Sequence, residues 1–218
     1  ADGRLAVVAR EADGTASVRT GRLTGAGATL TGRIAHPALC RANDLAFAGA
    51  TLLATLDRRD CAPSLRDLRP DARTGRVAAL GPDGPETRLD GLAFANGLAA
   101  LADGPAVAET RAGRIRLPDG RRVATPGAPD NLSLAGDGTL LAALHPSTFA
   151  LFLALTGLPI RPGARIARVD RATGGVALLF DDPRGSLFSA ATVALPLGAG
   201  FVAGSVIDAG LLICGEPA

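Results

Sequence analysis

The chain has 218 residues, of which 47% are hydrophobic and 20% are charged, and this length allows one sizeable core. Its net charge is +2 and its arginines are scattered, with no basic patch next to aromatic residues, so we expect no nucleic-acid binding. Nothing in the composition divides the chain. We therefore predict a single domain over residues 1–218.

Short apolar runs separated by Gly and Pro follow one another along the chain, which predicts an all-β protein. Residues 4–10 and 15–23 are predicted to form a hairpin around Asp13-Gly14. A charged, Pro-containing stretch from 57 to 70 predicts a long loop or a short helix. Residues 148–160 are the most apolar run, too short to span a bilayer, and we predict a buried strand or a short helix between blades, with burial favoured over the alternative of a lipid-facing position at the rim.

One pattern of two strands joined by a Gly-containing turn recurs along the chain, each time with a polar residue at its entrance. The chain contains three asparagines, and all three occupy the same phase of this repeat: Asn43, Asn96 and Asn131. Thr192 takes that place in a fourth copy. Repeats of about 35–60 residues made of a few short strands are typical of β-propeller blades.

In a propeller the inner strands begin around one central channel, so residues of equal phase converge there. We therefore expect the side-chain oxygens of Asn43, Asn96, Asp130 and Asn131 to meet at one point. Amide and carboxylate oxygens, without cysteine or histidine, suit a hard cation, and calcium is the predicted cofactor. The alternative is that each asparagine is a turn residue that hydrogen-bonds only to its own backbone.

Several of these segments together resemble the paraoxonase/arylesterase family of calcium-dependent β-propellers, which is related to strictosidine synthase-like and SMP-30/gluconolactonase-like propellers. They are Asn43-Asp44, Phe94-Ala95-Asn96-Gly97, Asp130-Asn131 followed by His145-Pro146, and the closing stretch from Thr192 to Cys214. The resemblance covers about residues 5–55 and 86–216. It implies a six-bladed fold of which this chain holds about four to five blades, so that the N-terminal blades are missing. An upstream segment or a partner is then expected to cover the open edge.

The resemblance implies an enzyme, a calcium-dependent hydrolase of lactones or aryl esters, in which the metal polarises the carbonyl and stabilises the oxyanion. It gives Asp44 to a second, structural calcium, and it assigns Phe94 and Thr192 to the substrate pocket. His145 is the one credible imidazole base, and with Asp130 it forms the predicted catalytic pair. His145 as a polar residue that merely ends its strand is the alternative.

Two departures from the family keep other functions open. The acidic ligand of the family's first blade has no counterpart, and Arg10 aligns with one of the family's paired histidines. A strictosidine synthase-like reaction and a non-catalytic interaction module therefore remain alternatives. A serine hydrolase is not expected, because no Gly-x-Ser-x-Gly occurs, and a zinc site is not expected for want of His and Cys clusters.

The three cysteines leave the redox compartment open. Cys40 and Cys61 could form a disulfide or remain free thiols. In the resembling family a cysteine at the place of Cys214 bonds to one near the N-terminus, and no such partner precedes Cys40. No signal peptide is visible, and only the family resemblance favours an extracytoplasmic location.

Overall fold

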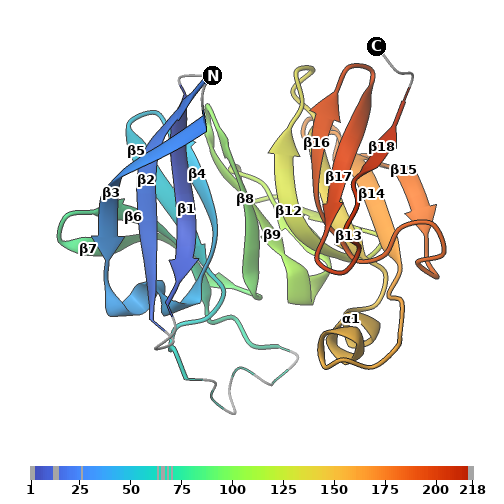
Figure 1. Cartoon of the computed structure of the whole chain (residues 1–218), viewed down its shortest axis with the longest axis horizontal. Coiled ribbons are helices and arrows are strands. Elements are labelled where there is room, and N and C mark those ends of the chain that lie inside the picture. Colours follow the sequence, from blue (N-terminus) through green and yellow to red (C-terminus); the bar gives the residue numbers. More distant parts are fainter. Residues whose placement is uncertain are drawn as a thin grey trace. The chain divides into compact units, whose positions relative to one another are not determined.

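The computed structural model describes residues 3–11, 15–25, 27–62, 64, 67, 69 and 71–215. The chain divides into two compact units, unit 1 (Ala1–Ala102) and unit 2 (Asp103–Ala218). The described strands form five antiparallel sheets of three or four strands, each built from segments that follow one another in sequence (Figure 1). These are blade-type sheets, so the predicted all-β fold class is confirmed, and their number agrees with the four to five blades expected.

Unit 1 contains the first two sheets (Figure 1, blue to green). The first has the order β1 (Arg4–Arg10), β2 (Ala16–Thr24) and β3 (Gly27–Ala35). The second has the order β4 (Ala42–Ala48), β5 (Thr51–Leu56), β6 (Gly75–Gly81) and β7 (Gly84–Leu92). The short 3-10 helix η1 (Pro37–Arg41) precedes β4, and β8 (Ala95–Leu101) lies beside β4.

The predicted strands at 4–10 and 15–23 are confirmed, while the turn at Asp13-Gly14 lies outside the described residues. Of the stretch 57–70, the described residues form bends and a turn without a helix; residues 63, 65, 66, 68 and 70 lie outside the described part. The core of unit 1 forms where the two sheets meet. Val18, Leu39 and Leu56 are fully buried there with small alanines of β4 and β6.

Unit 2 begins with β9 (Gly104–Glu109), the 3-10 helix η2 (Thr110–Ala112), β10 (Arg114–Arg116) and β11 (Arg122–Ala124). A four-stranded sheet follows with β12 (Ala128–Leu134), β13 (Leu140–His145), β14 (Ala164–Val169) and β15 (Val176–Asp182). The last sheet has β16 (Ala191–Leu197), β17 (Gly200–Ser205) and β18 (Leu212–Cys214). Leu141, Ile166 and Phe201 are buried between these two sheets.

The apolar stretch 148–160 contains the helix α1 (Thr148–Leu155), so the short-helix alternative is confirmed, but the predicted burial is wrong. No residue of α1 is buried, and Phe149 and Phe152 are 69% and 61% exposed. The helix follows the end of β13 outside the sheets (Figure 1), and its apolar residues lie on all sides, so no single contact could bury them. Within the described part of the chain, no helix is long and apolar enough to cross a bilayer.

Cys40 and Cys61 form a disulfide with their Cα atoms 5.7 Å apart, and Cys214 is a free, half-buried thiol. Of the two alternatives for Cys40 and Cys61, a disulfide or free thiols, the disulfide is therefore the one observed. It joins η1 to the segment that follows β5. The bond closes a loop that includes the whole β4–β5 hairpin.

Candidate functional site

The first strands of three sheets carry a β-bulge close to where they begin. In β4, Ala42 pairs with Leu56 and Leu45 pairs with Ala54, so that Asn43 and Asp44 share one opposite residue. An extra residue of this kind bends the strand and changes the direction of its side chains, and bulges are frequent next to functional sites. The predicted residues Asn43 and Asp44 are the two residues of this bulge.

The same bulge recurs twice in unit 2. In β12, Pro129 pairs with Leu144 and Leu132 with Ala142, which makes Asp130 and Asn131 equivalent to Asn43 and Asp44. In β16 the register shifts between Ala191 and Val193, which places Thr192 in the bulge. The sequence repeat therefore corresponds to a repeated irregularity of the backbone, and the predicted polar residues occupy it.

Two strands, β8 and β16, are preceded by a backbone conformation that is unfavourable for residues with a side chain. Phe94, just before β8, has φ of 63°, and Ala190, just before β16, has φ of 49°. A left-handed conformation costs a non-glycine residue of order 1–3 kcal/mol and is concentrated at functional sites. Asn96 and Thr192 each follow such a residue by two positions, so they occupy equivalent places. The assignment of Phe94 and Thr192 to a substrate pocket stays a prediction.

In unit 1, Asn96 is the most notable of the predicted residues because it is only 7% exposed and its Oδ1 has no hydrogen-bond donor among the described residues. An amide oxygen that is buried without a donor is costly. A cation or a water molecule at this point would satisfy it. Asn43 lies half-buried on the neighbouring strand β4.

The carboxylate of Asp44 accepts two backbone hydrogen bonds. Its Oδ1 accepts from the amide of Leu45 at 2.8 Å, and its Oδ2 accepts from the amide of Leu98 at 2.7 Å. Asp44 therefore ties β4 to β8 through the protein alone. The predicted role of Asp44 as a ligand of a structural calcium stays a prediction.

In unit 2, Asp130 and His145 form a direct contact, with His145 Nε2 2.9 Å from Asp130 Oδ2. His145 is 2% exposed, and its Nδ1 is buried without a hydrogen-bond partner in the part of the chain that the structure describes. A general base must reach the proton that it removes, directly or through water. Since Nε2 faces Asp130 and Nδ1 is enclosed, this geometry suits an imidazole that orients the Asp130 carboxylate.

Asn131 is fixed by a hydrogen bond from its Nδ2 to the carbonyl oxygen of Thr192 at 2.9 Å. This contact uses the amide nitrogen and leaves Oδ1 as the atom that can accept a donor or bind a cation. The bulges of β12 and β16 are thereby joined. In unit 2 the structure brings together Asp130, His145, Asn131 and Thr192, all four of which the sequence predicted.

The donor set fits calcium in its chemistry, because calcium accepts amide as well as carboxylate oxygens. The buried Oδ1 of Asn96, which has no donor, is the observation that favours an ion. Within the described ranges, no group of three or more His, Cys, Asp or Glu side chains could hold a metal, so the ligands would be mainly amides. The predicted convergence of Asn43, Asn96, Asp130 and Asn131 involves both units and stays a prediction.

Sequence reasoning missed the residues that hold these bulges. Thr55 lies opposite the bulge of β4 and its Oγ1 accepts the amide of Asp44 at 2.9 Å. Thr110 donates from its Oγ1 to the carbonyl of Pro129 at 2.7 Å. Neither threonine belongs to a motif. Their contacts depend on strand register and on neighbouring segments, which the repeat pattern did not specify.

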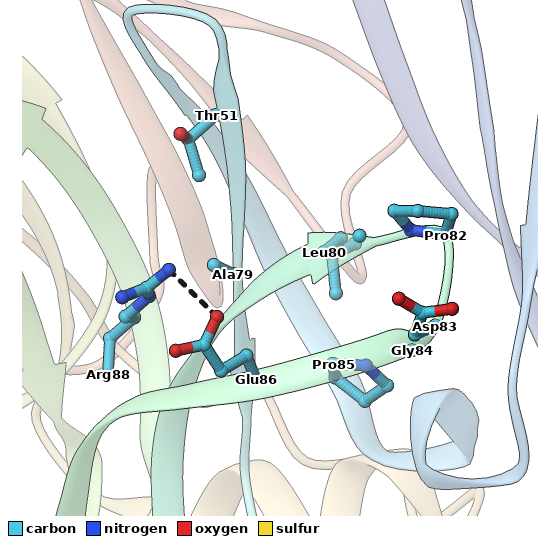
Figure 2. A pocket seen from close by; sticks show the side chains of 10 residues that line it. Thr51, Ala79, Leu80, Pro82, Asp83, Gly84, Pro85, Glu86 and Arg88 are labelled. Atoms are coloured by element: carbon cyan, nitrogen blue, oxygen red, sulfur yellow. Dashed lines mark hydrogen bonds and ion pairs between the residues drawn. The ribbon is translucent and has the colours of Figure 1, made fainter.

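A separate hollow of about 540 Å³ lies in unit 1 beside the β6–β7 hairpin (Figure 2). Pro82, Asp83 and Pro85 line it at the turn, and Glu86 and Arg88 form an ion pair of 2.9 Å at its side. None of the predicted site residues lines this hollow. It therefore contributes nothing to the candidate site.

No protein-family model matches this chain, and no curated protein matches it. A solved structure described as a candidate gluconolactonase superimposes with a TM-score of 0.52 at 13% identity, over 81% of this chain and 60% of the other. A candidate 6-phosphogluconolactonase from Bacteroides uniformis has a TM-score of 0.46 at 15% identity, over 93% and 75%. A protein from Lactobacillus plantarum has a TM-score of 0.48 at 14% identity, over 99% and 68%.

Sequence identities this low establish the fold alone, and the superposition with a TM-score of 0.52 is the one that supports the propeller fold. The chain spans 60% of the length of that candidate gluconolactonase. The description of that structure agrees with the expected likeness to gluconolactonase-like propellers, and the more specific resemblance to paraoxonases stays a prediction. The chain is an all-β protein with a β-propeller fold like that of the candidate gluconolactonase.

Proposed function

We propose that this chain takes part in the calcium-dependent hydrolysis of lactones, with aryl esters as a further substrate class. The observation that carries the proposal is the bulge of β12, where Asp130 is held by a buried histidine and stands next to an asparagine whose amide nitrogen is already used. A propeller fold like that of a candidate gluconolactonase supports it at the level of fold.

The proposed calcium ligands in unit 2 are the side-chain oxygens of Asp130 and Asn131, and Asn43 and Asn96 of unit 1 offer the same kind of amide oxygen. Calcium, when bound, would polarise the carbonyl of the substrate and stabilise negative charge on its oxygen. Asn131 is suited to the ligand role because its hydrogen bond to Thr192 holds the amide in one orientation. A ligand that is fixed before binding loses less conformational entropy when the ion arrives.

Asp130 is the proposed base. Its Oδ2 accepts the hydrogen bond of His145 and has a second lone pair for the cation, which leaves Oδ1 to take a proton from the attacking water. The new bond between that water oxygen and the carbonyl carbon would be followed by cleavage of the ring ester bond. The departing alkoxide would then recover the proton. His145 keeps the carboxylate oriented through these steps.

The substrate range follows from this single base. A phenyl ester has a good leaving group, and ring opening relieves the strain of a lactone, so both need little further acid assistance. An unactivated alkyl ester needs more assistance than Asp130 alone can give. We therefore expect hydrolysis of γ- and δ-lactones and phenyl esters, and poor hydrolysis of simple alkyl esters.

The test is a pH-stat assay of a δ-lactone and a phenyl ester, with and without a calcium chelator. We expect Asn131→Ala to abolish turnover, because a proposed calcium ligand is lost, and His145→Ala only to reduce it, because the proposed base Asp130 remains in place but is less well oriented. His36→Asn is the control for loss of a histidine, since asparagine can keep the cap hydrogen bond that His36 makes to Ala38. Activity that survives both chelation and Asn131→Ala would refute the proposal.

A non-catalytic interaction module is the second candidate function. It is favoured by Arg10, which aligns with a catalytic histidine of the resembling family but donates hydrogen bonds to the backbone carbonyls of Cys40 and Ala42. Calcium binding without any hydrolysis in the assay above would support this alternative.

A further inference from the structure

We propose that Thr110 and Arg10 are equivalent positioning residues, each of which holds the carbonyl that precedes a site bulge. The inference rests on the proposed function, because it concerns the orientation of the Asp130 and Asn43 side chains, which belong to the proposed calcium site. The register makes the two carbonyls equivalent: Ala42 pairs with Leu56 just before the bulge of β4, and Pro129 pairs with Leu144 just before the bulge of β12.

Thr110 is the first residue of η2 and directly follows β9. Its hydroxyl donates to the carbonyl oxygen of Pro129 at 2.7 Å. The threonine is itself well anchored, because the adjacent Glu109 is 1% exposed and accepts two hydrogen bonds from Arg114, each of 3.0 Å. The start of β12 is thus tied to a rigid neighbour on one side and, through Asn131, to Thr192 on the other.

Arg10 is the last residue of β1, and its guanidinium performs the corresponding task in unit 1. Its Nη2 donates to the carbonyl of Ala42 at 2.9 Å and its Nη1 to that of Cys40 at 3.2 Å. Thr110 and Arg10 both lie at the end of a strand, the former one residue beyond β9. A short hydroxyl and a long guanidinium thus donate to equivalent carbonyls.

A bulge needs this kind of support because it interrupts the hydrogen-bond ladder. If the strand relaxed to regular pairing, a shift of one residue would turn each following side chain to the opposite face. Asp130 would then lose its contact with His145. The hydrogen bond at Pro129 therefore acts on the site through the backbone, and Thr110 need not touch the substrate.

The direct test compares Thr110→Val, which keeps the shape of the side chain and removes the donor, with Thr110→Ser, which keeps the donor. The chain has only two histidines, so the imidazole ¹H–¹⁵N signals are readily assigned with the His36→Asn variant. We expect the ring signal of His145 to show a hydrogen bond in the wild type and in Thr110→Ser, and to shift or broaden in Thr110→Val.

Hydrolysis and calcium affinity give the second readout. Loss of one ordinary hydrogen bond is expected to lower kcat and calcium affinity about tenfold in Thr110→Val, with serine restoring both. The matched control is Thr139→Val, which removes a hydroxyl that donates to Asp137 at 2.7 Å, at the far turn of the same β12–β13 hairpin. This control should leave the His145 signal and the activity unchanged.

The outcomes separate the two proposals. A wild-type His145 signal in folded Thr110→Val, or a serine variant as impaired as the valine variant, overturns the positioning role whatever the activity. A His145 signal that is lost in Thr110→Val and restored in Thr110→Ser supports the positioning role, even if the wild type shows no hydrolysis. Absence of hydrolysis by the wild type, together with this behaviour of the His145 signal, would reject the proposed function but not the positioning role.

In unit 1 the corresponding measurement is hydrogen exchange at the bulge of β4. Arg10→Leu should raise amide exchange of residues 43–46, while exchange in unit 2 stays unchanged. Unaltered exchange at residues 43–46 in the folded variant would contradict the equivalence of the two residues.

Discussion

The ion pair between Glu109 and Arg114 offers a sharp test of how the structure holds the candidate site in unit 2. Two hydrogen bonds of 3.0 Å join the two side chains, and Glu109 is 1% exposed whereas Arg114 is 22% exposed. Glu109→Gln keeps the size of the side chain. It removes the charge and turns an amide N–H₂ toward the guanidinium, so a donor faces a donor.

The magnitude follows from burial. Breaking a fully buried ion pair typically costs about 3–5 kcal/mol, because the remaining charge loses its partner. Arg114 retains some access to water, so we expect a loss of about 2–4 kcal/mol in the free energy of unfolding. The pair of Glu86 and Arg88 has one hydrogen bond of 2.9 Å, but its side chains are 67% and 52% exposed. Glu86→Gln should therefore cost about 1 kcal/mol at most.

The assay is urea unfolding of both variants at one pH and salt concentration. With a typical slope of about 1–3 kcal/mol per molar urea, Glu109→Gln should lower the midpoint by roughly 1–2 M. Glu86→Gln is the matched control, with the same chemical change at an exposed pair. A loss for Glu109→Gln within about 0.5 kcal/mol of the control would refute the view that this buried pair anchors η2 and Thr110.

Three further predictions concern other features of the fold. Replacing both Cys40 and Cys61 by serine should lower the free energy of unfolding by about 3 kcal/mol, because the disulfide spans 21 residues, and urea unfolding of this variant should match that of the reduced wild type. Burial acts to raise the pKa of Asp182, but backbone hydrogen bonds from residue 184 and residues 186–188 outweigh it and lower the pKa below 3.8. The carboxylate is therefore stabilising above that value, and the cost of Asp182→Asn should shrink as the pH of the unfolding experiment falls through the lowered pKa. Ala190→Gly should leave stability within about 0.5 kcal/mol, since relief of its positive φ offsets the lost methyl group, whereas Ala191→Gly, equally buried in β16, should cost about 1–2 kcal/mol by thermal unfolding.

Much of the fold was predictable because its strands alternate with Gly-rich turns. The same phase of Asn43, Asn96 and Asn131 also revealed the repeat. These asparagines lie in β4, β8 and β12, each the first strand of its sheet, but the register makes Asn43 equivalent to Asp130, so Asn131 is one residue out of the predicted phase. Local sequence carries such information, since strand propensity and turn chemistry act over a few residues.

The bulges were not predictable, because a bulge is a property of two paired strands. Only the register of β4 against β5 shows that Asn43 and Asp44 share one opposite residue. The anchoring of Pro129 by Thr110 likewise depends on a segment that lies 19 residues away. Neither the register of two paired strands nor a hydrogen bond from another segment can be recognised from the sequence of one strand.

The exposure of α1 shows the limit of hydrophobicity as a guide. An apolar run indicates that burial would be favourable, but the segment must also have a surface to pack against. Thr148–Leu155 follows the strand end at His145 and Pro146 and begins at the Ser147 cap. The helix lies outside the sheets, a placement that the sequence did not specify, and Phe149 and Phe152 are therefore exposed.

The central claim is that oxygen atoms at the bulged strand starts bind calcium. Isothermal titration calorimetry of the wild-type chain and of Asp130→Asn with calcium chloride tests it most directly. We predict saturable binding by the wild type and affinity at least about tenfold weaker in the variant, because a carboxylate ligand is replaced by a neutral amide. Absence of binding to the wild type, or equal affinity in both proteins, would contradict the claim.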